Sequence, residues 1–297
     1  MNSAEPRSQV SDDQQQIEQK LYESVEALLP RFKERTEETR QLRKVPQASI
    51  DELQEAGYFL ALQPRRFGGY EMSPQSFFRA SIKIAEACMS TAWSSGVVAV
   101  HAFQLALMDE RAQKDVWGDD IHTRVSSSYA PLGKVEVVEG GFKLSGRWGW
   151  SSGSDHCTWV LLGAIIPNDG YRTFLVPMPD YRIEDTWQAM GLQGTGSNDI
   201  VVEDAFVPDY RTHRQIDGFQ LTNPGYAASD APLYRIPWAQ IFARAVCSPA
   251  IGATRAAIEL FKQGALGKAS ADPTKLAQDT ATQMLIANAI TEIDEIE

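Results

Sequence analysis

Apolar residues along the first 120 positions of the chain recur at the spacing of an α-helix. Ile17, Leu21 and Val25 follow one another at intervals of four residues, which places them on one face of an otherwise charged helix. The same spacing resumes after a loop rich in glycine and proline and continues to Trp117. This pattern predicts a series of helices over about residues 11–120.

From about residue 122, apolar and polar residues alternate as they do in β-strands. The segments KVEVVEGGFKLSG and WVLLGAIIPNDGYRTFLVPM each contain two alternating runs around a turn with glycine, which is typical of a β-hairpin. A further run, NDIVVEDAFVP, ends at Pro208. The alternation predicts an antiparallel β-domain between helical segments.

Residues 213–237 form a long irregular segment rich in Asn, Pro, Gly and Ser, and a loop of this length is usually functional or disordered. Helical spacing returns from about Trp238 to Phe261, and again from Asp272 to the end. The fold class predicted is therefore α+β. The three predicted units are residues 1–121 (helical), 122–212 (antiparallel β, barrel-like) and 213–297 (a loop and helices).

Composition narrows the possible functions. The net charge of −11 argues against a surface for nucleic acid or for an anionic membrane. Cys88, Cys157 and Cys247 form no CxxC pair, and the four histidines lack the spacing of metal ligands, so no metal site is predicted. The polar N-terminus lacks the apolar segment of a signal peptide, which favours a cytoplasmic location. The uncharged stretch 87–108 contains Ser, Thr, His and Gln, and it is expected to be a buried helix rather than a membrane span.

Three stretches at the ends of predicted strands remain as candidate functional sites. No GxGxxG, GxxxxGK[ST] or HExxH motif occurs, and the GxSxG match at Gly149–Gly153 is followed by further strands rather than the helix of a nucleophile elbow. The three stretches are GRWGWSSGSDH (146–156), RVSSSYAP (124–131) and MGLQGTGSNDIVVEDAFVP (190–208). Their hydroxyls and glycines suit the polar rim of a planar heterocycle or a phosphate. Tight turns that need Ser and Gly for conformational reasons are the alternative.

Taken in order, these stretches resemble the acyl-CoA dehydrogenase superfamily, in which a helical domain, a β-domain and a four-helix bundle enclose a flavin. AVHAFQLALMDERAQKDVWGDD, RVSSSYAPLG and WGWSSGSDHCTWVLLG are similar to one branch of it. That branch holds the oxygenase components of two-component (group D) flavin-dependent monooxygenases, including p-hydroxyphenylacetate and secosteroid hydroxylases. The resemblance covers about residues 15–297 and is most specific over 97–208. It implies that 213–297 hold only the first part of the bundle, because the family continues past this ending with a second active-site histidine. Gln193 departs from the Arg that relatives often carry.

The resemblance implies a function. A separate flavin reductase would supply reduced FMN or FAD, which reacts with O2 to a C4a-hydroperoxide that hydroxylates a phenolic or indolic substrate. The protein would bind and orient these molecules and exclude water. A homotetramer is the assembly expected of the family. Neither the aromatic substrate nor the choice between FMN and FAD follows from the residues.

The resemblance also assigns roles to single residues. Trp150 would pack against the isoalloxazine, and Ser152 would hydrogen-bond to flavin N5. His101 would bind or deprotonate a phenol, a role that suits imidazole near neutral pH, and Ser127 would contact substrate or flavin. Further candidates are Ser128, Thr195, Gly196 and Ser197 for the cofactor and Trp93 and Phe103 for the substrate, with Trp148, Phe219 and Tyr234 as aromatic residues able to line its pocket. For each residue the alternative is a structural role, and His213 is expected at the surface.

Two other functions remain open at this point. An acyl-CoA dehydrogenase or related flavin oxidase has the same fold, although dehydrogenases usually carry an A-x-T-E-P type of segment where this chain has RVSSSYAP. The second alternative is a truncated, noncatalytic paralogue that binds no flavin. The presence of His101, Trp150 and Ser152 argues against a decayed site.

Overall fold

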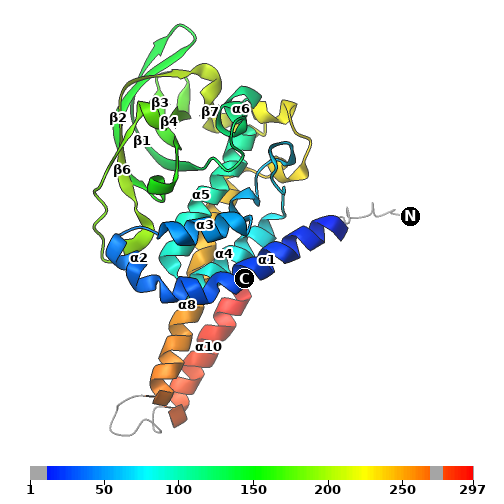
Figure 1. The fold of residues 1–297 in the computed structure, drawn as a ribbon, viewed down its shortest axis with the longest axis vertical. Helices are drawn as coiled ribbons and strands as arrows, with labels where there is room; N and C mark the ends of the chain where they lie inside the picture. Colours follow the sequence, from blue (N-terminus) through cyan, green and yellow to red (C-terminus); the bar gives the residue numbers. More distant parts are fainter. Residues whose placement is uncertain (1–11, 268–276, 297) are drawn as a thin grey trace.

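The computed structural model describes residues 12–267 and 277–296, and the part before the first strand is helical (Figure 1). The helices before the first strand are α1 (Asp12–Glu34), α2 (Thr36–Leu42), α3 (Gln47–Glu55), α4 (Pro74–Ala87), α5 (Met89–Leu107) and α6 (Glu110–Trp117). Leu21 and Val25 are buried on one face of α1, as their spacing predicts. The predicted helical segment is confirmed over the described residues.

Helix α5 is the core element of the helical part. Almost all its residues from Thr91 to Leu107 are buried, and it packs against α4 and α8. This burial explains why the stretch carries no charge, because a charged side chain in such a position would lose its hydration. Among the described residues, no helix is both long and apolar enough to cross a membrane.

The strands form one seven-stranded sheet at the end of the molecule opposite α10 (Figure 1), in the order β5-β6-β2-β1-β3-β4-β7. Their bounds are β1 (Val125–Val138), β2 (Gly141–Ser151), β3 (Trp159–Ile166), β4 (Gly170–Pro177), β5 (Arg182–Glu184), β6 (Asn198–Pro208) and β7 (Thr212–Arg214). Both predicted hairpins, β1–β2 and β3–β4, are confirmed. The prediction of a purely antiparallel sheet was wrong, since β1 and β3 pair in parallel. Alternation of apolar residues is the same for both pairings, so it cannot distinguish them.

Trp148 is the central side chain of the β-domain. It is completely buried on β2, and its indole N–H donates to the carbonyl of Gly163 on β3 at 2.8 Å. A Cβ at Gly133 or at Gly146 would lie within 3 Å of its ring. These two glycines therefore leave the space that the indole fills, and Trp148 belongs to the core of the sheet.

The chain after the sheet returns to the helices. The segment expected to be irregular contains α7 (Gln215–Gln220) and two short 3-10 turns before α8 (Trp238–Gly267) and α10 (Thr280–Ile296). Helix α8 runs past the predicted end at Phe261, where α10 packs along it. The predicted start at Asp272 lies outside the described residues. The predicted domain boundaries stay predictions.

Helix α8 lies unusually close to α4. A Cβ at Gly252 would lie only 2.0 Å from the carbonyl oxygen of Ile82. The approach therefore requires glycine at this position. It brings the first turns of α8 over α5 and the start of β1, where the candidate site lies.

Candidate functional site

The turn after β2 places an exposed indole next to a buried hydroxyl. Trp150 adopts a left-handed backbone conformation, with φ 64°, which residues with large side chains seldom adopt. Trp150 is 79% exposed, whereas Ser152 is 6% exposed. The chain therefore holds a flat apolar ring at the surface in a costly conformation, directly beside a polar group that is almost closed to water.

Ser152 belongs to a chain of hydrogen bonds that joins three parts of the fold. The indole N–H of Trp93, on α5, donates to Ser152 Oγ at 3.1 Å. Ser152 Oγ lies 2.8 Å from Ser197 Oγ, and Ser197 Oγ lies 2.6 Å from Thr195 Oγ1. Thr195 Oγ1 donates to the carbonyl of Leu192 at 3.0 Å. Four predicted site residues are thus brought into one connected network.

The serines at the start of β1 lie close to this turn. Ser127 and Ser128 are both buried, and Ser128 Oγ donates to the carbonyl of Gly149 at 2.7 Å. Because neighbouring residues of a strand face opposite sides, Ser127 points away from that bond. Ser128 therefore joins β1 to the segment that carries Trp150 and Ser152. Gly196 follows the same network with φ 55°, and its N–H donates to the carbonyl of Arg43 at 2.8 Å.

His101 is completely buried in the middle of α5. Its Nδ1 lies 2.7 Å from the carbonyl of Val125, so Nδ1 carries the proton and Nε2 is an acceptor. Nε2 is buried without a hydrogen-bond partner among the described residues. Burial lowers the pKa of His101 to about 4, and the bond to Val125 opposes this only in part. The imidazole is therefore a neutral base with a free lone pair at neutral pH.

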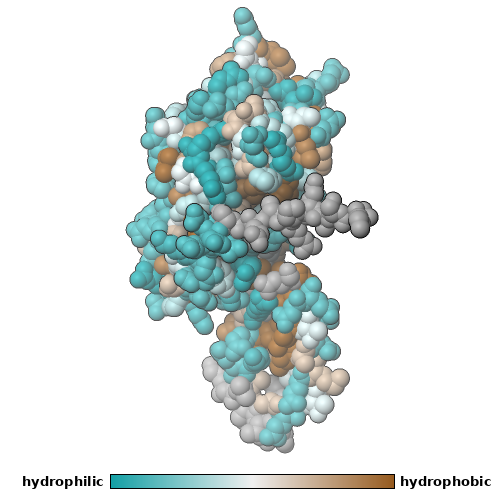
Figure 2. Space-filling view, turned by 90° about the vertical axis from the view of Figure 1, so that its right-hand side faces the viewer, coloured by the Kyte–Doolittle hydropathy of each residue, from teal (hydrophilic) through white to brown (hydrophobic). Residues whose placement is uncertain are grey.

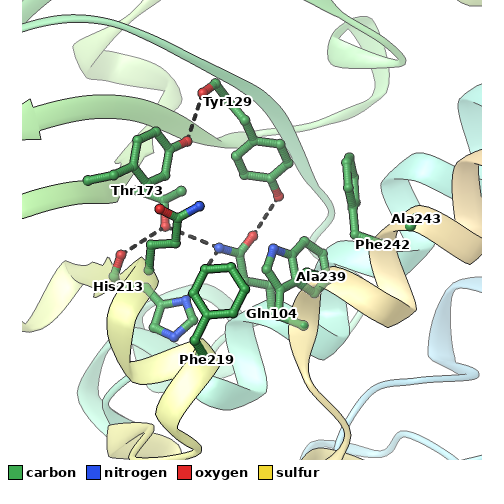
Figure 3. Close-up of a pocket in the computed structure, with 12 residues that line it drawn as sticks. Gln104, Tyr129, Thr173, His213, Phe219, Ala239, Phe242 and Ala243 are labelled. Carbon is green, nitrogen blue, oxygen red and sulfur yellow. Dashed lines mark hydrogen bonds between the residues drawn. The ribbon is translucent and has the colours of Figure 1, made fainter.

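A pocket of about 330 Å³ is lined by two rings that neighbour His101, although His101 itself is buried and does not line it. The imidazole ring lies beside the rings of Tyr129 and Phe242, with centroids 6.0 and 6.4 Å away, and both of these rings line the pocket. Figure 3 shows side chains from α5, the sheet, α7 and α8 meeting around the space. The lining residues are Gln104, Tyr129, Tyr171, Thr173, His213, Gln215, Gly218, Phe219, Trp238, Ala239, Phe242 and Ala243.

The polar groups of the pocket wall are bonded to one another (Figure 3). The Tyr129 hydroxyl donates to Gln104 Oε1 at 2.5 Å, and Gln104 Nε2 donates to Thr173 Oγ1 at 3.1 Å. His213 Nε2 lies 2.8 Å from Asn223 Oδ1, so it donates there, and burial lowers the pKa of His213. The described lining residues therefore carry no charge near neutral pH.

The structure places several predicted residues away from the pocket. Phe103 is completely buried in the helical core, where its ring packs on Trp238 and Tyr234, and Tyr234 is also a core residue. Trp148 was wrongly expected to line a pocket, because it fills the sheet. His213 was wrongly expected at the surface, because it is 3% exposed in the pocket wall. Phe219 does line the pocket, as expected.

Sequence reasoning missed Gln104, Trp238 and Phe242. Gln104 lies three residues after His101, and Trp238 and Phe242 are four residues apart, so each pair shares a helix face. This spacing was a usable signal for neighbouring pocket residues. It does not reveal which sheet residue faces them, and that information comes from the packing of β1 against α5.

Comparisons with known proteins agree with this fold. Residues 11–123 match the family described as acyl-CoA dehydrogenase, N-terminal domain. The chain is 43% identical over 276 residues to the flavin-dependent monooxygenase oxygenase subunit HsaA of Rhodococcus jostii (strain RHA1), covering 91% of this chain and 72% of that protein. It is 34% identical over 248 residues to the oxygenase component of p-hydroxyphenylacetate 3-hydroxylase from Acinetobacter baumannii, covering 82% of this chain and 59% of that protein.

A solved structure shows the same similarity in three dimensions. The crystal structure of 3-HSA hydroxylase from Rhodococcus sp. RHA1 superimposes with a TM-score of 0.87 at 41% sequence identity. The match covers 93% of this chain and 72% of the solved one. The chain therefore belongs to the family of flavin-dependent monooxygenase oxygenase subunits built on the acyl-CoA dehydrogenase fold.

Proposed function

We propose that this chain acts as the oxygenase component of a two-component monooxygenase, which accepts reduced FMN or FAD from a separate reductase and hydroxylates an aromatic substrate with O2. The observation that carries the proposal is the exposed indole of Trp150 beside the buried hydroxyl of Ser152. The neutral imidazole of His101, which packs against two aromatic rings of the pocket wall, supports it. The reduced flavin would supply the electrons that activate O2.

The residues present fit a flavin. A planar isoalloxazine needs an apolar face and hydrogen-bonding groups at its edge. The Trp150 indole offers the first, and Ser152 offers the second with one lone pair that no described residue uses. Ser127, Ser128 and Gly196 lie on segments next to Ser152 and remain candidates for further cofactor contacts.

The other side chains would bind and orient the substrate. His101 would accept a hydrogen bond from a phenol hydroxyl or an indole N–H through Nε2, which carries no proton at neutral pH because burial lowers the pKa of the ring to about 4. The rings of Tyr129, Trp238 and Phe242 would hold the rest of the molecule away from water. An apolar pocket also protects the reaction from competing hydrolysis.

Titration with flavin under anaerobic conditions tests the proposal. We expect reduced FMN or FAD to bind, and Ser152→Ala to weaken its binding by about fivefold, since one neutral hydrogen bond is lost. Ser152→Thr, which keeps the hydroxyl, is the matched control. Binding of oxidised FAD that an acyl-CoA then reduces would instead favour a dehydrogenase, and failure of both flavins to bind would favour a noncatalytic paralogue.

The pocket further favours a neutral substrate. The described lining residues offer no cation, so a carboxylate placed there would lose its hydration without gaining an ion pair. A relative acts on p-hydroxyphenylacetate, which carries such a group. The wall instead offers aromatic faces and the indole N–H of Trp238, for which no partner occurs among the described residues. We propose that the substrate of this chain is a neutral phenol or indole with an uncharged substituent.

Two compounds of nearly equal shape test the charge preference. We expect kcat/KM for p-hydroxyphenylacetamide to exceed that for p-hydroxyphenylacetate by at least about tenfold, a difference of about 1.4 kcal/mol. Ala243→Arg, which adds a cation at an exposed position of the pocket, should reduce this preference, whereas Ala243→Gln should leave it unchanged. Equal turnover of the two compounds by the parent chain would contradict the proposal.

We also propose a homo-oligomer, a tetramer as in the family expectation, in the cytoplasm where a reductase supplies the flavin. Several apolar side chains along α8 and α10 are exposed (Figure 2). The exposed ones are Leu260, Phe261, Met284, Leu285, Ile290 and Ile296. Exposed apolar patches of this kind usually pack against other protein segments, either further helices of the same bundle or another subunit.

A further inference from the structure

A single set of proton directions makes all the hydrogen bonds among the hydroxyl groups next to Ser152 at once. Thr195 Oγ1 donates its single proton to the carbonyl of Leu192, so it can only accept from Ser197. Ser197 thereby uses its own proton and can only accept from Ser152. The proton of Ser152 is therefore directed toward Ser197.

Trp93 closes the other side of Ser152. An indole N–H can only donate, and it reaches Ser152 Oγ at 3.1 Å. Ser152 thus accepts from Trp93, donates to Ser197 and keeps one free lone pair. Ser152, Ser197 and Thr195 are 6%, 4% and 1% exposed, so bulk water does not compete for these bonds. Toward anything that binds in front of it, Ser152 is an acceptor.

We propose that this chain of hydrogen bonds makes the site selective for reduced over oxidised flavin. The inference rests on the proposed function and on the role that the family resemblance implies for Ser152, a hydrogen bond to flavin N5. In the reduced flavin N5 carries a hydrogen and donates, whereas in the oxidised flavin N5 has only a lone pair. The oxygen of Ser152 therefore bonds to the reduced form and repels the oxidised form. Ser197, Thr195 and Trp93 are positioning residues that act through Ser152.

Reversing the direction of the hydrogen bonds between Ser152, Ser197 and Thr195 would cost one hydrogen bond. For Ser152 to donate to an oxidised flavin, its proton must leave Ser197. The proton of Ser197 must then turn toward Ser152. The Thr195 hydroxyl must donate to Ser197 instead of the carbonyl of Leu192, because otherwise the lone pairs of Ser197 Oγ and Thr195 Oγ1 would face each other. The Leu192 carbonyl is held in place by the indole N–H of Trp187 at 3.0 Å. One neutral hydrogen bond corresponds to about a fivefold difference in affinity.

Anaerobic titrations of the full chain with reduced and oxidised FMN test this inference. The quantity measured is the ratio of the two dissociation constants, oxidised over reduced, together with the midpoint potential of the bound flavin. In Ser197→Ala and in Thr195→Val the hydroxyl proton of Ser152 is no longer held toward position 197, so Ser152 can donate to oxidised flavin. Each variant is expected to lower the ratio by about fivefold. For a two-electron couple this shifts the midpoint potential by about 20 mV to more negative values. Thr195→Ser keeps the hydroxyl and should preserve both quantities.

The outcomes separate this inference from the proposed function. Binding of reduced flavin with an unchanged ratio in both Ser197→Ala and Thr195→Val would overturn the selectivity mechanism and leave the proposed function intact. Failure of the parent chain to bind either flavin would overturn both. A loss of affinity that is equal for the two redox states would show a merely structural role, because damage to the fold does not distinguish a donor at N5 from an acceptor.

Discussion

Replacing His101 with asparagine is expected to lower the rate of substrate hydroxylation by about 10²- to 10⁴-fold, the usual contribution of a positioned acid or base. The amide of asparagine can still donate to the carbonyl of Val125, which His101 Nδ1 contacts at 2.7 Å. No atom of the shorter side chain replaces Nε2. The variant therefore removes the free acceptor while it preserves the bond that holds this part of α5 to β1.

Steady-state turnover with a phenol, combined with a titration of reduced flavin, measures this effect. Flavin affinity should stay within about twofold of the parent, since His101 is assigned to the substrate rather than the cofactor. His101→Gln, whose amide reaches further, should retain part of the activity. Full turnover by His101→Asn at saturating substrate would contradict the assigned role.

The same residue makes stability depend on pH. The pKa of His101 is about 4 in the folded chain and about 6.5 in the unfolded one, so between these values the unfolded chain binds more protons. The stabilising contribution of the neutral His101 is therefore fully present above pH 6.5. As the pH drops from 6.5 toward 4, the free energy of unfolding falls by up to about 1.4 kcal/mol per pH unit. Burial lowers the pKa of His213 as well, which acts in the same direction. Urea unfolding at pH 7, 6 and 5 measures the slope, which should be smaller in His101→Asn.

Trp148→Ala is expected to lower the free energy of unfolding by about 3–5 kcal/mol, the typical cost of removing a buried large aromatic side chain. Trp148 is fully buried, and the glycines at positions 133 and 146 have no side chains of their own that could fill the cavity. The carbonyl of Gly163 would also lose the indole N–H that it accepts at 2.8 Å. Urea unfolding followed by circular dichroism measures the difference.

Trp150→Ala is the matched control, since the same side chain is removed two positions further along the chain. Because Trp150 is 79% exposed, its removal should change the free energy of unfolding by no more than about 0.5 kcal/mol. It should instead weaken the binding of reduced flavin. Equal losses of stability in the two variants would show that Trp150 is also a structural residue.

Much of this protein could be predicted from the sequence because its elements carry strong local patterns. The apolar face of α1 and the two hairpins follow from the spacing of apolar residues and from glycine-containing turns. These signals are local, since each reports only which side chains share a face. The resemblance to the flavin-dependent oxygenases added the fold class and the family, and both were confirmed.

The candidate site was predictable only in part. Ser152, Ser197 and Thr195 were identified as site residues, but their connection to Trp93 was not. Trp93 lies 59 residues before Ser152 in the chain, and Ser197 lies 45 residues after it. No periodicity extends over such distances, so the direction of their protons could not be inferred.

The sequence by itself determined where helices and strands form, which faces are apolar and which family the chain resembles. Only the tertiary structure decided that Trp148 fills the sheet while Trp150 faces outward, and that His213 lies in a pocket wall rather than at the surface. The reason is physical: local patterns describe one element at a time, whereas burial and hydrogen-bond partners depend on which other elements pack against it.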